Sequence, residues 1–307
     1  MRGAFDLSAS MVLGLTVLAS SALSAHANTL AIVPRVATRA RPVPKRAPGT
    51  DGTIGAAIAR QAKKVLHPRP QTEGDVAERD PDGACPSEMA NVDQRLCVDR
   101  WEGALEEVAA DGSGVPWPAT TVLDLTKRYR AVSKAGLVPQ AYISGAQAET
   151  ACREAGKRLC NNAEWRLACS GSEGTIYPYG PAHVDRRCND YGVAPMYVFY
   201  PQVERSWSGV TNTDMNDPRL NLLENTIAKT GSHRDCVNDY GLYDMVGNLH
   251  EWTSDPYGTF QGGYYLDTQI NGEGCAYRTT AHDFDYHDYS TGFRCCSDLK
   301  PAPDEED

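Results

Sequence analysis

Ten cysteines constrain the folding of this 307-residue chain more than any other feature. All of them lie between Cys85 and Cys296, and their number is even. Such a set is typical of a domain that matures in an oxidising compartment and is held together by disulfide bonds. A zinc site is the rival interpretation, but the chain lacks the paired CxxC spacing of structural zinc sites. We therefore expect disulfides and no free thiol.

The N-terminal residues have the three parts of an export signal. Arg2 supplies a positive charge, residues 11–23 are uncharged and mostly apolar, and the small-x-small pattern AHA ends at Ala27. The apolar stretch is shorter than the roughly 20 residues that span a bilayer. We interpret residues 1–27 as a signal peptide and expect no transmembrane segment. The mature protein is then secreted, or periplasmic and associated with the cell envelope.

Composition divides the rest of the chain into three parts. Residues 28–82 are rich in Arg, Pro and Ala, with 10 basic and 6 acidic residues, which predicts a disordered linker. A solvated linker is favoured over one that touches an anionic envelope surface. Residues 83–300 form the predicted domain and residues 301–307 an acidic tail. From residue 83 onward there are 19 basic and 33 acidic residues, so we expect no nucleic-acid partner.

Capping signals mark two helices in the domain. Ser144 and Asn161 each precede a helical spacing of apolar residues and have Gln or Glu three positions later. Gly156 and Gly171 then end the two patterns. Short strands rich in β-branched and aromatic residues are expected at 94–99, 260–266 and 277–280.

Several motifs follow one another in a characteristic order along the domain. They are CVDRWE at 97–102, AGKRLCNNAEWRLACSG at 155–171, YPYG at 177–180, YGLYDMVGNLHEW at 240–252, GGYY at 262–265 and TGFRC at 291–295. This order resembles the formylglycine-generating enzyme family, also called the sulfatase-modifying factor family. The resemblance implies a compact, loop-rich α+β domain related to C-type lectins, with little regular secondary structure. It does not by itself give a reaction, because one fold can carry several activities.

The oxidases of this family hold Cu(I) between two cysteine thiolates and use O2 to convert a sulfatase cysteine into formylglycine. Counting from the family motifs, the first thiolate position falls near Asp267 and the second near Ile270 or Asn271. Because thiolates are the ligands that select Cu(I), we expect no copper. Cys275 is another candidate, but its spacing to Cys295 better matches a structural cysteine of the family.

The resemblance also implies two disulfides, Cys152–Cys295 and Cys169–Cys275, which would tie both helices to the C-terminal strands. The other six cysteines allow 15 pairings. Sequence proximity and a nearby NDYG tetrapeptide at two of the cysteines guide our choice among these pairings. The favoured pairs are Cys85–Cys97, Cys188–Cys236 and Cys160–Cys296.

Calcium is the metal that the resemblance implies. The family's VGNxxEW segment binds Ca²⁺ through main-chain carbonyls and the Glu carboxylate, which are the hard oxygen donors that this ion prefers. A second family site uses an Asn and the residue after it. The alternative is that these groups only cap turns. The matching positions are Val246, Gly247, Leu249 and Glu251 for the first site, and Asn189 and Asp190 for the second.

A histidine-containing segment, AHDFDYHDY at 281–289, departs from the family pattern. His282, His287 and Asp267 together suggest a site for iron or zinc, whereas a polar surface loop is the favoured interpretation. His250 is expected to be a half-buried packing residue. The positions that correspond to the family's substrate cleft are Trp252, Asp267, His287 and Ser290.

Three functions remain open. The favoured one is a secreted, disulfide- and calcium-stabilised module that binds a protein or a glycan. The second is an oxidoreductase of the family with a displaced metal site, for which Asp267, His287 and Cys275 are the catalytic candidates. The third is a structural envelope component tethered through residues 28–82. Hydrolase and nucleotide-binding motifs such as HExxH or a phosphate loop are absent from the sequence.

Overall fold

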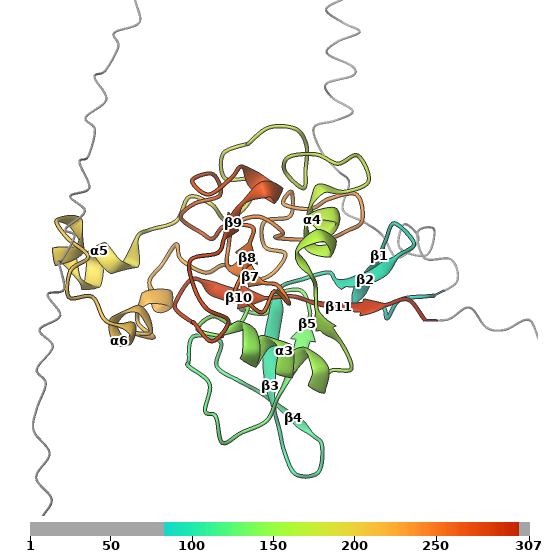
Figure 1. Cartoon of the computed structure of the whole chain (residues 1–307), viewed down its shortest axis with the longest axis horizontal. Helices are drawn as coiled ribbons and strands as arrows, with labels where there is room; N and C mark the ends of the chain where they lie inside the picture. The colour runs from blue at the N-terminus through green and yellow to red at the C-terminus, as the bar shows by residue number, and fades with distance from the viewer. Residues whose placement is uncertain (1–82, 301–307) are drawn as a thin grey trace, which may run out of the picture. The chain divides into compact units, whose positions relative to one another are not determined.

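The computed structural model describes residues 83–300, so the expectations for residues 1–27, 28–82 and 301–307 lie outside the described residues. Short helices and strands alternate with long irregular segments (Figure 1), and the domain is loop-rich α+β as expected. None of the helices within 83–300 has the length and apolar character that crossing a membrane requires.

Residues 83–300 contain three small sheets, with the strand orders β1-β2-β11-β6, β10-β7-β8-β9 and β4-β3-β5. Within them β7 and β10 pair in parallel, and the other described pairs are antiparallel. A single residue, Arg294, separates β10 in the second sheet from β11 in the first. The strands are β1 (Met89–Val92), β2 (Leu96–Asp99), β3 (Gly103–Val108), β4 (Gly114–Pro116), β5 (Tyr129–Ser133), β6 (Arg158–Leu159), β7 (His250–Trp252), β8 (Phe260–Gln261), β9 (Arg278–Thr279), β10 (Thr291–Phe293) and β11 (Cys295–Asp298).

The strands are shorter than the sequence pattern predicts, because turns cut into them. β2 begins at Leu96 rather than at residue 94, since Gln94 has a φ of 55° and belongs to the turn after β1. β8 ends at Gln261 because Gly262 and Gly263 follow with φ angles of 87° and 74°. Such positive angles suit glycine and interrupt a strand.

Both predicted helices are present and capped as expected. In α3 (Gly145–Glu154) and α4 (Asn162–Ser170) the capping boxes of Ser144 and Asn161 are complete. The structure adds short helices that the sequence pattern did not indicate. They are α5 (Pro195–Phe199), α6 (Asn212–Met215) and the 3-10 turns η1 (Pro201–Glu204), η2 (Leu220–Leu222) and η3 (Gly274–Ala276). Figure 1 shows α5 and α6 together at one side of the domain.

All ten cysteines form disulfides, and the five expected pairs are confirmed. Two of these bonds tie α3 to β11 and α4 to η3. In the chain-entropy model, closing loops of this length stabilises the fold by about 4–5 kcal/mol each. The pairs are Cys85–Cys97, Cys152–Cys295, Cys160–Cys296, Cys169–Cys275 and Cys188–Cys236.

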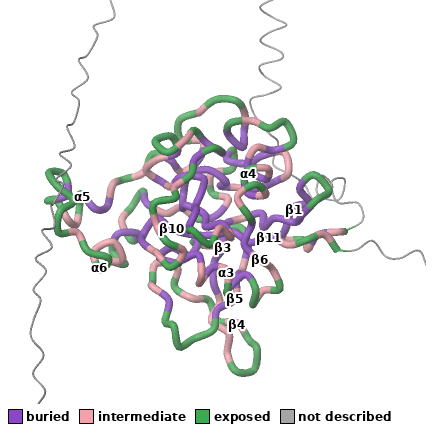
Figure 2. Tube along the Cα trace, in the orientation of Figure 1, coloured by how far each residue is buried: buried purple, intermediate pink, exposed green. Residues whose placement is uncertain are grey.

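The interior holds two main hydrophobic clusters. Trp165 of α4 belongs to one, and Trp252 of β7 and Phe293 of β10 belong to the other. Figure 2 shows the buried segments gathered where the sheets meet, with the exposed residues along the outer loops. The interior also contains buried charged residues, among them Glu102, Glu251 and Arg294.

Candidate functional site

The four residues expected in the substrate cleft are not joined to one another by any hydrogen bond, ion pair or ring contact found in the described part of the chain. Trp252 is buried in β7, where its Nε1 donates to the Ile143 carbonyl at 2.9 Å. Ser290 is also buried, and its Oγ donates to Asp288 Oδ1 at 2.7 Å. Both side chains serve the local packing of the strands.

Asp267, at the expected position of the first thiolate, caps a turn. Its Oδ1 accepts from the main-chain N–H of Gln269 at 2.9 Å and from that of Ile270 at 3.1 Å. Ile270 is 83% exposed, and its hydrocarbon side chain has no atom that could bind a metal. Cys275 is bonded to Cys169. The expected copper positions therefore present no thiolate.

The two histidines of segment 281–289 have separate partners. His282 stacks on Tyr286, with ring centroids 3.8 Å apart. His287 meets Asn216 instead, through Nδ1 and Oδ1 at 2.7 Å, and burial lowers the pKa of His287. Within residues 83–300, no group of three or more His, Cys, Asp or Glu side chains is arranged to hold a metal ion.

His250 packs among aromatic rings, as expected, but is more deeply buried than the sequence suggested. Its ring lies 4.6 Å from that of Phe260 and 4.8 Å from that of Tyr264, measured between centroids. Burial lowers the pKa of His250 to about 3, and its Nδ1 has no hydrogen-bond partner. The residue is therefore a neutral core imidazole.

The two segments with calcium-site resemblance lie directly against each other. The Asn189 carbonyl accepts from Asn248 N at 2.8 Å, and Asn189 Nδ2 donates to Asn248 Oδ1 at 2.8 Å. Gly247 has a φ of 83°, and a Cβ at this position would come within 2.4 Å of the Asn189 oxygen. A glycine is required here both for its backbone angle and for this close approach.

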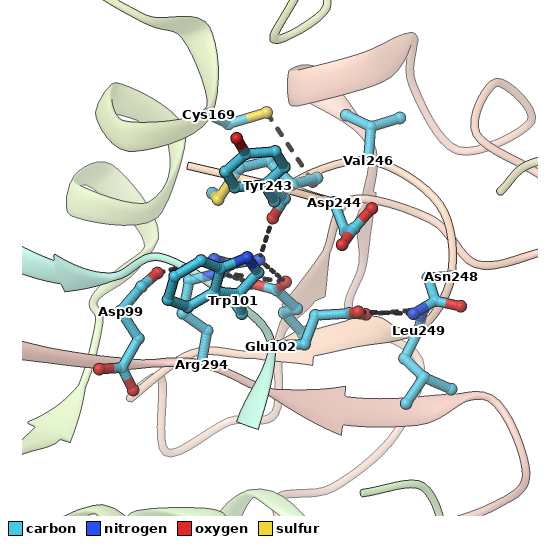
Figure 3. Close-up of polar contacts among 12 residues, drawn as sticks. Asp99, Trp101, Glu102, Cys169, Tyr243, Asp244, Val246, Asn248, Leu249 and Arg294 are labelled. Atoms are coloured by element: carbon cyan, nitrogen blue, oxygen red, sulfur yellow. Dashed lines mark hydrogen bonds and ion pairs between the residues drawn. The ribbon is translucent and has the colours of Figure 1, made fainter. Parts of the chain in front are cut away.

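Glu102, directly before β3, holds the other side of the 246–251 loop (Figure 3). One of its carboxylate oxygens accepts from Asn248 Nδ2 at 2.5 Å, and the other accepts from Leu249 N at 3.1 Å. Asn248 has a φ of 58°. Its buried side chain lies between those of Glu102 and Asn189 and bonds to both. The loop is thus fixed from two distant parts of the chain.

Arg294 forms the centre of a buried network behind this loop. Its Nη2 contacts Glu251 at 2.8 Å, and both side chains have no exposed surface. Nη1 donates to the Asp99 carbonyl at 2.7 Å, and Nη2 donates also to the Tyr243 carbonyl at 2.8 Å. The second Glu251 oxygen accepts from Trp165 Nε1 at 2.7 Å. This network joins β2, β7, α4 and the junction of β10 with β11.

Three buried acidic residues, Glu102, Asp244 and Glu251, interact electrostatically with Arg294. Burial raises the pKa of Asp244 to about 7. Burial, reinforced by the charges of Asp244 and Glu251, raises the pKa of Glu102 well above its usual range. Three buried carboxyl groups next to a single guanidinium favour a proton or a further cation on at least one of them.

The residues expected to bind calcium fit the ion unequally. The main-chain oxygens of Gly247 and Leu249 accept no hydrogen bond from residues 83–300, so they are available to a cation. Asp190 Oδ1 is buried and unpaired, whereas its Oδ2 lies 2.6 Å from His183 Nε2. Glu251, by contrast, is fully engaged by Arg294 and Trp165. The two loop carbonyls and Asp190 Oδ1 thus have oxygen atoms without a hydrogen-bond partner in the described residues, whereas both Glu251 oxygens are occupied.

Sequence reasoning missed three members of the network: Glu102, Asp244 and Arg294. Each lies inside or beside a recognised motif, CVDRWE, YGLYDMVGNLHEW or TGFRC. The available signal was the presence of charged residues within otherwise apolar motif segments. Nothing in the sequence shows, however, that these three segments meet in the core.

Comparisons with known proteins give a family and several relatives for this chain. The Sulfatase-modifying factor enzyme 1-like domain profile matches residues 102–299. Inactive C-alpha-formylglycine-generating enzyme 2 from Bos taurus is 28% identical over 179 residues, covering 54% of this chain and 52% of the relative. Formylglycine-generating enzyme from Bos taurus is 30% identical over 118 residues, covering 38% of this chain and 27% of the relative. The structure of PvdO from Pseudomonas aeruginosa is 14% identical with a TM-score of 0.40, covering 66% of this chain and 80% of that one.

Proposed function

The chain belongs to the family of sulfatase-modifying factor enzyme 1-like domains. We propose that it is a member of this family without oxidase activity. In this proposal it acts as a disulfide-bonded, calcium-stabilised module that binds a protein or a glycan outside the cytoplasm. The five disulfides support an oxidising location.

One observation carries the proposal: every cysteine of residues 83–300 is in a disulfide. Cu(I) is selected by soft thiolate ligands, and a hard carboxylate such as that of Asp267 holds it poorly. Cys275 lies nearest in sequence to the expected copper positions, but its sulfur is bonded to that of Cys169. The chain therefore offers the family scaffold without the two thiolates of the oxidase.

The names of the relatives do not distinguish between an active and an inactive enzyme. Relatives named as formylglycine-generating enzyme and as its inactive form 2 both match. The chain spans about half the length, or less, of these curated relatives. The chemistry of the residues in this chain, rather than the names of its relatives, supports the non-oxidising function that we propose.

Calcium is the cofactor that we propose, held by the carbonyls of Gly247 and Leu249 and by Asp190. When bound, it would supply positive charge beside the buried carboxyl groups and hold two loops together. Its role would be structural, because oxygen ligands on irregular loops are typical of stabilising calcium sites.

The test offers the purified full chain a peptide with a sulfatase-type cysteine motif, Cu(I) and O2. Aldehyde formation is measured by mass spectrometry after capture with an aminooxy reagent, with an active formylglycine-generating enzyme as the positive control. We expect no aldehyde above the level without protein. Thiol titration in denaturant without reductant accompanies the assay and should also give no signal.

Aldehyde production by the chain would contradict the proposal, and variants would then locate its source. Loss of activity in Cys275→Ser would make Cys275 catalytic. Loss in Asp267→Ala or His287→Ala, with Cys275→Ser still active, would indicate the displaced metal site of the alternative oxidoreductase.

A further inference from the structure

One cavity in residues 83–300 is lined by none of the residues of the buried network. It has a volume of about 540 Å³ and is bordered by α3, by residues 123–129 and by part of segment 281–289. Its apolar wall includes Leu123, Tyr129 and Ala151, all buried in the domain. A volume of this size is in the range of ligand pockets in proteins.

Both cations at this pocket are already paired with carboxylates of the domain. Lys127 Nζ contacts Glu107 Oε2 at 2.8 Å, and Arg128 forms an ion pair with Glu154. Because of these pairs, neither cation provides an uncompensated positive charge for an anionic ligand. An anion would have to displace a partner first.

Two acids at the pocket, by contrast, are not neutralised. Asp124 has no ion pair within residues 83–300: it accepts from the main-chain N–H and the hydroxyl of Thr126, and Lys127 adds only a weaker electrostatic attraction. Asp285 is exposed and has no ion pair within the described residues. The pocket therefore combines an apolar wall with unbalanced negative charge.

His287 adds a hydrogen-bond acceptor of defined orientation. Asn216 Nδ2 donates to the Asn212 carbonyl at 2.8 Å and to the His287 carbonyl at 3.0 Å, which fixes the orientation of the amide. Asn216 Oδ1 must then accept from His287 Nδ1, which therefore carries the hydrogen. In the neutral ring, Nε2 has a free lone pair, and the ring lines the pocket.

We propose that this pocket binds a peptide segment that presents a lysine or arginine side chain. The alkyl stem of such a side chain suits the apolar wall of Leu123, Tyr129 and Ala151. Its cationic end suits the carboxylates of Asp124 and Asp285 and the acceptor on His287. The exposed apolar side chain of Leu125, 82% accessible at the edge, provides contact for a neighbouring peptide residue. This inference rests on the proposed function in that it names a partner class for a binding module.

The probe is the acetylated and amidated tripeptide Leu-Arg-Ala, titrated into the full chain by isothermal calorimetry. Its citrulline counterpart has nearly the same shape without the charge. We expect the arginine peptide to bind at least tenfold more tightly than the citrulline peptide at low salt, with weaker binding as salt screens the carboxylates. Equal binding of the two peptides would overturn the proposal.

A matched pair of variants locates the interaction. Asp111 and Asp124 have the same local contacts, each accepting from an N–H and a hydroxyl two residues later, but only Asp124 lines the pocket. We expect Asp124→Asn and Asp285→Asn each to weaken binding about two- to fivefold, and Asp111→Asn to leave it unchanged. Binding that is insensitive to both pocket variants would place the peptide elsewhere and refute the inference.

Butylguanidine distinguishes a peptide from a small cation as the ligand. We expect it to bind at least tenfold more weakly than the tripeptide, because it lacks the contacts of the neighbouring residues. Equally tight binding of butylguanidine would contradict a peptide partner. None of these outcomes depends on aldehyde formation, so failure of this inference and failure of the proposed function can be told apart.

Discussion

The carboxylate of Glu251 and the guanidinium of Arg294 form an ion pair of 2.8 Å from which solvent is completely excluded. Glu251 belongs to the segment in which the family resemblance implies a calcium ligand, and Arg294 links two sheets. Two additional partners, Trp165 and the Asp99 carbonyl, come from other parts of the chain. The pair therefore stabilises the meeting point of several segments, and its charges determine what else the site can hold.

Removing one member of this pair should be costly. We expect Glu251→Gln to lower the free energy of unfolding by about 3–5 kcal/mol, because it removes the one carboxylate found to hydrogen-bond to Arg294 within the described residues, whereas Glu102 and Asp244 act on that charge without contacting it. The matched control is Glu107→Gln, which breaks the partly exposed pair with Lys127 and should cost at most about 1 kcal/mol. Urea unfolding with disulfides intact measures both, and equal losses in the two variants would disprove the central role of the pair.

The contact between Gly247 and Asn189 should be intolerant of a side chain. Gly247 and Gly112 have φ angles of 83° and 82°, but a Cβ on Gly112 meets nothing within 4 Å. Both alanine variants therefore carry similar backbone strain, and only Gly247→Ala also meets the Asn189 oxygen. We expect Gly247→Ala to destabilise the protein by about 1–3 kcal/mol more than Gly112→Ala does. Indistinguishable melting temperatures would show that the two loops are not held together.

Calcium should stabilise the folded chain. An ion present at 100 times its dissociation constant stabilises by about 2.7 kcal/mol, so we expect the melting temperature of metal-free protein to rise by about 5–10 °C. Asp190→Asn should remove most of this rise, because it replaces the charged carboxylate whose Oδ1 has no hydrogen-bond partner. Asp185→Asn is the control, since Asp185 also lies beside His183, at 3.4 Å, but is 88% exposed. A full calcium response in Asp190→Asn, or none in the unmodified protein, would contradict the proposed ligand.

Asp99 should give the protein a measurable pH dependence. Burial raises the pKa of Asp99 from 3.8 to about 6, even though Lys157 Nζ lies 2.6 Å away. The folded state then holds this proton more tightly than the unfolded state does, so stability falls as the pH rises from about 4 to 6. We expect Asp99→Asn to remove a decrease of about 3 kcal/mol across this window.

Asp298→Asn, at an 85% exposed position, is the control for this pH dependence and should leave it unchanged. Denaturant unfolding between pH 4 and pH 7 gives the comparison. An unchanged slope in Asp99→Asn would assign the effect to other buried acids such as Asp244.

Much of the framework could be predicted from local sequence. The helices after Ser144 and Asn161 were predicted correctly because a capping box depends on residues only three positions apart. The lengths of β2 and β8 were overestimated, because a composition that favours strands does not reveal where Gln94 or Gly262 takes a positive φ. The α5–α6 region showed no helical spacing of apolar residues, so its helices were not expected.

The sequence alone determined the set of available chemical groups. It established that an even number of cysteines was available for pairing, that the expected thiolate position near Asp267 lacks a cysteine, and that the order of motifs is that of the family. Only the tertiary structure decided which charged groups meet. Glu102, the neighbouring pair Asp244 and Glu251, and Arg294 come from three segments far apart in the chain, and their interactions depend on burial and on distances of a few ångströms, which local sequence does not encode.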